Sequence, residues 1–346
     1  MVLVKWFMET SAPQIKDGWV RALLFFIAVP FVVSLLKLIL FIPIALISGA
    51  GSLFEILWLG LNSNNNKNEL EMLGMSIITL FGTVYTVFLF QKFINRTSTV
   101  LDSEFIFSMG LDFNRYKNDF VSGLFFGFVL SALGFLIFYI FNLSSLVLAK
   151  VSFLDQLIYI LFFVIISLNN GIIIWGYIFH NLSSSFNRYT ALFFAALAFM
   201  YLNYFEVLKY SHFASTYNVM LTNFNVFLVG LFIGVYCIHK KNLWFPIGAH
   251  FALKYFQGPV FGFQYGGYAG AGNWIDSIVN QRLWIKLKPN IVVHEGGVKS
   301  ATSPINYYDE SILITGGKFY SIEGSIIFTG LMVLGIILVH KRYSTS

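Results

Sequence analysis

The residues of this chain best suited to chemistry are polar side chains within long apolar stretches. A polar group in hydrocarbon is costly, so such side chains usually face a partner or a cavity. His250 and Lys254 are four residues apart and share one face of a helix. Asn169, Asn170 and Asn203 lie in two other apolar stretches. Counted from the expected helix ends, the five lie about 10–19 Å deep, which predicts a buried polar cluster between three helices.

Each of these side chains also has a purely structural interpretation. His250 can be a hydrogen-bonded packing residue, and Asn170 and Asn203 can join helices through amide hydrogen bonds. Lys254 carries a charge near mid-bilayer, so it can lie against helix carbonyls, extend toward the membrane surface or lose its proton. Neither asparagine supplies a negative charge for it.

Glu206 is the acidic residue that sequence position places closest to this group. It is a candidate for a relocated catalytic carboxylate, or else an interfacial residue near Lys209. Its expected depth of about 24 Å, against about 10 Å for His250, predicts no contact between them. His250 has no second ligand at metal-binding spacing, and His294 and Glu295 lie together in a polar segment, so we expect no metal and no cofactor.

The composition places these residues in a membrane protein. Hydrophobic residues make up 57% of the 346, only 11% are charged, and the mean hydropathy is +0.74. Soluble domains carry about 25% charged residues. The net charge of +6 rests on so few charges that it indicates topology-setting basic residues and no nucleic-acid partner. The single cysteine, Cys237, excludes an intrachain disulfide.

Hydropathy predicts an all-α integral membrane bundle of about eight helices, each needing about 20 apolar residues to cross the bilayer. The first apolar run, Ala22 to Ala50, is longer than the ~7–15 residues of a cleavable signal and is interpreted as a retained span. Lys37, Pro30 and Pro43 suggest a kinked or partly interfacial segment there. The predicted spans are 23–48, 71–93, 119–142, 157–180, 190–208, 226–239, 243–257 and 322–340.

The placement of Lys and Arg predicts that both termini are cytoplasmic, in an inner or plasma membrane. The three short outer loops then hold three basic residues, Lys67, Lys150 and Lys209. The cytoplasmic segments hold twelve, namely Lys5, Lys16, Arg21, Lys92, Arg96, Arg115, Lys117, Arg188, Lys240, Lys241, Lys341 and Arg342.

A long outer segment, residues 264–320, is predicted to form a small β-containing insertion. It begins glycine-rich and then alternates apolar and polar residues from Leu283 to Lys288, a pattern typical of short strands. Apolar residues return at 291–293 and 312–314, so a small extracytoplasmic β-hairpin is plausible.

Three segments carry motif-like patterns in a fixed order: NGIIIWGYIF at 170–179, FMYLN at 199–203 and HFALK at 250–254. In order, spacing and flanks they resemble the CPBP family, the CAAX-protease and bacteriocin-processing (Abi) intramembrane endopeptidases. The family motifs are Glu-Glu-x-x-x-Arg, Phe-x-x-x-His and His-x-x-x-Asn. The resemblance covers roughly residues 105–340.

The resemblance implies a glutamate that activates water, with histidine assistance and an Asn–His oxyanion site. Of the family's catalytic residues only His250 remains, and Phe199 keeps the aromatic position of the second motif. The glutamates are replaced by Asn170 and Gly171, the arginine by Trp175, the first histidine by Asn203 and the final asparagine by Lys254.

An amide oxygen is barely basic, and general-base catalysis contributes about 10²–10⁴-fold, so these losses predict a pseudoprotease that binds a membrane or envelope partner. The first alternative is an active intramembrane endopeptidase with a rearranged site built on His250 and Glu206. A transporter or channel, suggested by Lys37 and Lys254, comes last because no paired broken helices or pseudo-symmetric halves are present.

The predicted organisation has five parts. They are a cytoplasmic tail (1–22), an N-terminal transmembrane region (23–104), a CPBP-like transmembrane core (105–263), the extracytoplasmic insertion (264–320), and the last transmembrane helix with its cytoplasmic tail (321–346).

Overall fold

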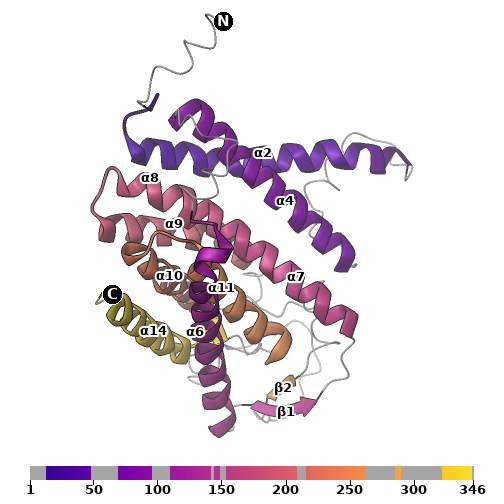
Figure 1. Cartoon of the computed structure of the whole chain (residues 1–346). Helices are drawn as coiled ribbons and strands as arrows, with labels where there is room; N and C mark the ends of the chain where they lie inside the picture. The colour runs from indigo at the N-terminus through magenta and orange to yellow at the C-terminus, as the bar shows by residue number, and fades with distance from the viewer. Residues whose placement is uncertain are drawn as a thin grey trace, which may run out of the picture.

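The computed structural model describes residues 13–47, 69–95, 110–141, 144–148, 153–208, 216–261, 285–289 and 322–344, and these are almost entirely helical (Figure 1). Six of the described helices are long and apolar enough to cross a membrane. This agrees with the predicted polytopic helical membrane protein. The apolar spans are Gly18–Leu40, Leu73–Asn95, Phe113–Ile140, Gln156–Ser183, Val219–His239 and Ile326–Ser344.

Several of the helical rods are composite, because an α-helix continues directly into a π-helical segment (η). Two further predicted spans fall on α9 and α11, which are not among the six apolar spans, so eight crossings stay a prediction. In chain order the helices are α2 (Gly18–Ile47), α4 (Glu69–Leu89) with η2 (Phe90–Asn95), α6 (Phe113–Ile140), α7 (Phe153–Asn170) with η3 (Gly171–Ile178) and α8 (Phe179–Ser183), α9 (Arg188–Leu208), α10 (Thr216–His239), α11 (Trp244–Tyr255) with η5 (Phe256–Val260), and the 3₁₀ turn η7 (Ile322–Gly324) before α14 (Ile326–Ser344).

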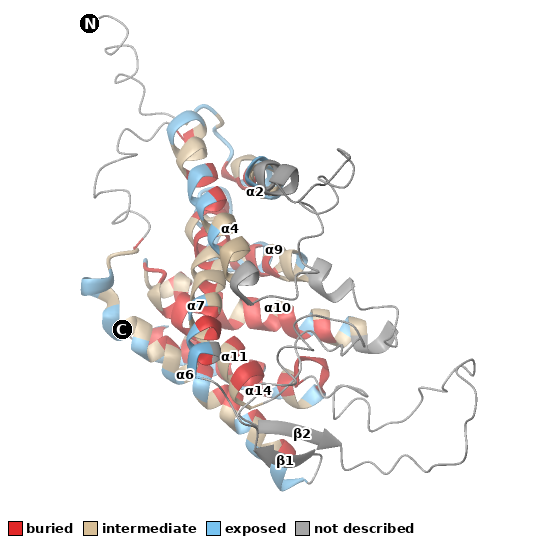
Figure 2. Cartoon of the chain, turned by 90° about the vertical axis from the view of Figure 1, so that its right-hand side faces the viewer, coloured by how far each residue is buried: buried red, intermediate tan, exposed pale blue. Residues whose placement is uncertain are grey.

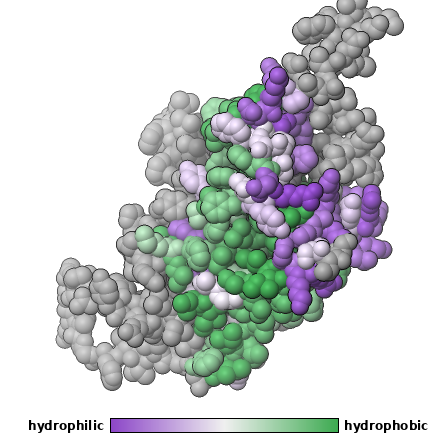
Figure 3. All heavy atoms as spheres, turned by 90° about the vertical axis from the view of Figure 1, so that its left-hand side faces the viewer, coloured by the Kyte–Doolittle hydropathy of each residue, from purple (hydrophilic) through white to green (hydrophobic). Residues whose placement is uncertain are grey.

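The centre of the bundle is formed by α10 and α11. Helix α11 packs against α6, α7 and α10, while α10 also contacts α9 and α14; α2 and α4 lie against each other, and α4 rests on α7 (Figures 1 and 2). Large apolar side chains such as Phe31, Phe81 and Phe153 remain exposed on the outer helices. Figure 3 shows a broad hydrophobic face with hydrophilic residues gathered along one edge, the distribution that a bilayer requires.

Small residues bring α6 and α11 into close backbone contact. Gly123 and Gly127 form a Gly-x-x-x-Gly pair on α6, and Gly248 faces them from α11. A Cβ on Gly127 would lie 2.6 Å from the carbonyl oxygen of Ala249, and one on Gly248 would lie 2.5 Å from that of Phe120. Only glycine fits at this separation, and such close packing is a main source of helix association in membranes.

Two helices differ from their predicted extents. Helix α10 begins at Thr216, ten residues before the predicted start at 226, because polar residues in its first half concealed the span. Thr222 and Asn225 among them are fully buried and face other helices. Helix α2 runs as one α-helix through Pro30 and Pro43, where a kink was expected.

A two-stranded antiparallel sheet lies at one end of the bundle (Figure 1). Strand β2 (Ile285–Pro289) falls where the alternating pattern predicted a strand, and its partner β1 (Ser144–Leu148) belongs to the α6–α7 connection. Leu146 pairs with Leu287 in the register. The other predicted strand segments of the insertion, at 291–293 and 312–314, lie outside the described residues, and the insertion as a unit stays a prediction.

Candidate functional site

The three motif segments meet in the core, on η3, α9 and α11. Gly171 opens η3 and lies against α11, since a Cβ there would be 2.9 Å from Cγ1 of Ile247. The ring of Trp175 stacks on Phe199 at 6.4 Å between centroids, and the ring of Phe199 meets that of His250 edge to face at 5.5 Å. Five residues far apart in the sequence thus form one continuous group, which we call the motif core.

A π-helix carries the first motif. The eight residues of η3 follow α7 without a break, and seven of them are buried. At its far end the hydroxyl of Tyr177 donates to Oδ1 of Asn95, the last residue of the π-helical segment η2. π-Helical turns add a residue to the helical register and occur frequently at functional sites. Here η3 turns Trp175 into the core between α9 and α10.

Trp175 stands where the resemblance would place an arginine. The side chain is buried, and a Cβ on Gly234 of α10 would collide with its six-membered ring. Leu192 of α9 closes on the same glycine. The described residues that contact the ring of Trp175 are therefore apolar, and none of them is a cation.

His250, to which the resemblance would assign a catalytic role, is deeply buried. The residue is 2% exposed, and neither ring nitrogen has a hydrogen-bond partner among the described residues. Its ring contacts the apolar edge of Phe199. The ring therefore packs in the core, and the hydrogen bond expected of a packing histidine is not among the contacts of the described residues.

Lys254 forms a buried ion pair with Glu323. Its Nζ lies 2.6 Å from Oε1 of Glu323, which belongs to the turn η7 before α14. The two residues are only 6% and 3% exposed. Glu323 is therefore the carboxylate that the described side chains place beside Lys254, and the pair is buried from solvent.

Asn225 of α10 holds the same turn in place. Its Nδ2 donates to the carbonyl oxygens of Glu323 (2.7 Å) and Ser325 (3.0 Å), and its Oδ1 accepts a hydrogen bond from the hydroxyl of Thr329 (2.6 Å). Ser325 in turn accepts from the backbone N–H of Phe328 and so caps α14. The ion pair and the amide together fix η7 against α10 and α11.

The asparagines of the predicted polar cluster have separate environments. The Nδ2 of Asn203 donates to the carbonyl oxygen of Phe199 in its own helix at 2.7 Å. Asn170 is half-buried at the α7–η3 junction and makes no capping hydrogen bond there. Oδ1 of Asn169 is buried without a hydrogen-bond partner among the described residues. Glu206 lies on the last turn of α9, and its side chain falls outside the described part of the chain.

Three residues of this site were missed by sequence reasoning: Glu323, Asn225 and Thr329. A usable signal existed for the first, because Glu323 directly precedes an apolar span while Lys254 lacked a partner. Charged residues within or beside spans seldom remain unpaired, so the two could have been matched. Asn225 was missed because its helix was predicted to begin at residue 226, so Asn225 was assigned to the preceding loop.

Lys254 occupies the carboxylate of Glu323. Within the described residues, no group of three or more His, Cys, Asp or Glu side chains could hold a metal ion. Oε1 of Glu323 accepts a hydrogen bond from Nζ of Lys254 at 2.6 Å, so one of its two oxygens is engaged in this contact. Comparisons of the chain with protein-family models, with curated proteins and with solved structures give no match.

Proposed function

We propose that this chain is a non-catalytic membrane protein of the CPBP type that acts by binding a membrane or envelope partner. The observation that carries the proposal is the ion pair between Lys254 and Glu323. It commits the carboxylate that contacts Lys254 of the third motif segment to a structural role, in a chain with Asn170 and Gly171 where the resemblance would place two glutamates. The contacts among Trp175, Phe199 and His250 support the resemblance, because they join the three motifs.

Hydrolysis would need a general base that is free to activate water. A general base must reach the water it activates at about 2.6–3.2 Å, with a free lone pair. Glu323 is held by Lys254, and the described residues that contact the ring of Trp175 are apolar, so neither place presents a carboxylate that is free to activate water. The membrane-embedded surface of the helical bundle would still be able to bind another polypeptide chain.

A paired assay tests this function. The purified chain in proteoliposomes is incubated with an internally quenched prenylated peptide and with casein, and in parallel is photocross-linked to its membrane neighbours in cells. We expect no cleavage above that of empty liposomes and one specific cross-linked protein partner. Cleavage by the wild type, or cross-links that match the general membrane protein background, would contradict the proposal.

A second candidate is an intramembrane endopeptidase with a rearranged site. The observation that favours it is the buried imidazole of His250, whose nitrogens have no hydrogen-bond partner among the described residues. It requires that His250→Ala abolish cleavage of a substrate which the wild type cuts, while Asn223→Ala on the neighbouring α10 retains it. Equal cleavage by both variants excludes this candidate.

We further propose that all eight predicted spans cross the membrane, with both termini in the cytoplasm. Contacts bring together the helix ends that carry most of the basic residues. The N–H of Gln14 donates to the carbonyl oxygen of Ile94, Arg188 donates to that of Ile238, and the N–H of Leu243 donates to that of Gly110. These ends gather the basic residues that the positive-inside rule assigns to the cytoplasm.

A further inference from the structure

Two histidines join the ends of α10 and α14. Nε2 of His239 lies 3.1 Å from Nδ1 of His340, and the centroids of the two rings are 5.0 Å apart. His239 is the last residue of α10, and His340 belongs to the last turns of α14, so the contact closes these helices at the end of α14 that leads to the C-terminus (Figure 1). Both residues are half-buried, so protons from the aqueous phase can reach them.

The charges around this pair are all of one sign. The charged groups that act on His239 are His340, Arg188 and Lys240, and each of them is a cation or can become one. Lys341 follows His340 directly on α14. A proton added to either ring therefore meets repulsion from the cations already there.

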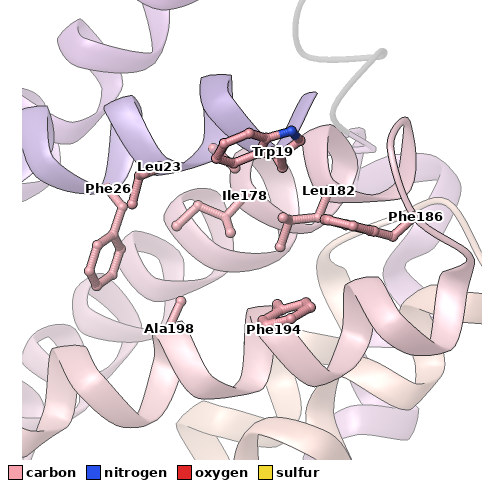
Figure 4. Close-up of a pocket in the computed structure, with 9 residues that line it drawn as sticks. Trp19, Leu23, Phe26, Ile178, Leu182, Phe186, Phe194 and Ala198 are labelled. Carbon is pink, nitrogen blue, oxygen red and sulfur yellow. The ribbon is translucent and has the colours of Figure 1, made fainter. Parts of the chain in front are cut away.

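Helix α9 brings one of these cations to the pair. Its Phe194 and Ala198 line an apolar groove toward α2 (Figure 4), whereas Arg188 at its start donates from Nη1 to the carbonyl oxygen of Ile238 on α10 at 3.1 Å. The ring of Tyr189 lies 6.4 Å from that of the α14 histidine. The guanidinium is thus fixed one residue away from the α10 histidine.

We propose that His239 and His340 form a proton-dependent latch, which holds α14 against α10 while at least one ring is neutral and opens when both are protonated. A neutral imidazole has one donor and one acceptor nitrogen, whereas an imidazolium has two donors. The hydrogen bond between the rings therefore survives the first proton, and the second proton removes the only acceptor. It also places two like charges side by side, next to Arg188 and Lys240, so acidification separates the two helix ends.

Titration of the imidazoles tests the latch directly. The chain is labelled with ¹⁵N-histidine, reconstituted in nanodiscs and followed by NMR from about pH 8 to about pH 4, with signals assigned through His239→Gln and His340→Gln. We expect the two rings of the wild type to take up their protons in two separate steps, because the second proton must break the hydrogen bond. The remaining ring of each single variant should titrate in one step. A single common step for both rings in the wild type overturns the proposal.

The pH dependence of stability gives the second test. The folded chain resists the second proton, which the unfolded chain accepts freely, so the stability from the latch is present above about pH 6.5 and is lost as the pH falls below it. On acidification to about pH 4.5, the unfolding temperature of the wild type should fall about 2 °C or more further than that of the double variant His239→Gln/His340→Gln, whose amides do not titrate.

His180→Gln is the control for this comparison, because it removes a histidine of α8 that is not part of the latch. It should keep the pH dependence of the wild type. An equal pH dependence in the wild type and the double variant overturns the proposal.

Discussion

At the scale of single residues, the pair formed by Lys254 and Glu323 governs the stability of the core. Removing one partner of a buried ion pair leaves an uncompensated charge and costs about 3–5 kcal/mol, whereas an apolar pair of similar volume is often tolerated. We therefore expect Lys254→Met and Glu323→Leu each to lower the free energy of unfolding by about that amount, and the double variant to recover much of the loss. Denaturation of the detergent-solubilised chain measures this.

Lys241→Met provides the reference for this cycle, because Lys241 is exposed. An exposed charge contributes little, so this variant should unfold like the wild type. If the single core variants also unfold like the wild type, the ion pair has no structural role.

Asn225 and Asn223 offer a second test at this scale, because they are two residues apart on α10 with different roles. Asn225→Ala leaves the buried carbonyl oxygens of Glu323 and Ser325 without their donor, which should cost about 1–3 kcal/mol. Asn223 donates to Val219 within its own helix, so Asn223→Ala should change much less. Equal losses in thermal unfolding would contradict the assignment.

At the scale of elements, the contact of α6 with α11 depends on the absence of side chains. In Gly127→Leu the new side chain meets the backbone of Ala249, which cannot rotate away, so we expect a loss of about 1–3 kcal/mol or more, with reduced yield of folded protein. Gly330→Leu is the control, since a Cβ there meets nothing within 4 Å. Size-exclusion profiles and thermal unfolding should separate the two variants clearly.

Hydropathy predicted the bounds of some helices better than those of others. The run 120–142 contains no charged residue, so its helix is visible in the sequence, and only the start of the helix at Phe113, capped by Asp112, was misplaced. Helix α10 was cut short because Thr222 and Asn225 resemble loop residues until their partners are known. The pairing of β1 with β2, and of Lys254 with Glu323, joins distant segments, and no local pattern encodes such contacts.

At the scale of the whole molecule, the orientation in the membrane can be measured. We expect a reporter active only in the cytoplasm to be active when fused after residue 346, and a reporter active only outside to be active when inserted near residue 275. The gathering of Arg21, Arg188 and Arg115 toward one end of the bundle is the physical reason. The opposite pattern would invert the orientation, and two reporters active on the same side would mean an even number of crossings between residues 275 and 346, in place of the single crossing expected.

The ion pair of Lys254 with Glu323 has a consequence for how the chain can be divided. Lys254 and Glu323 are 69 positions apart, and α14 is also joined to the rest by His239–His340 and Ser122–Tyr343 hydrogen bonds. The docking of α14 therefore does not depend on an uninterrupted backbone. Two polypeptides, ending and restarting between residues 290 and 300, should complement each other when co-expressed and co-purify as one unit, and Glu323→Leu in the shorter fragment should prevent this.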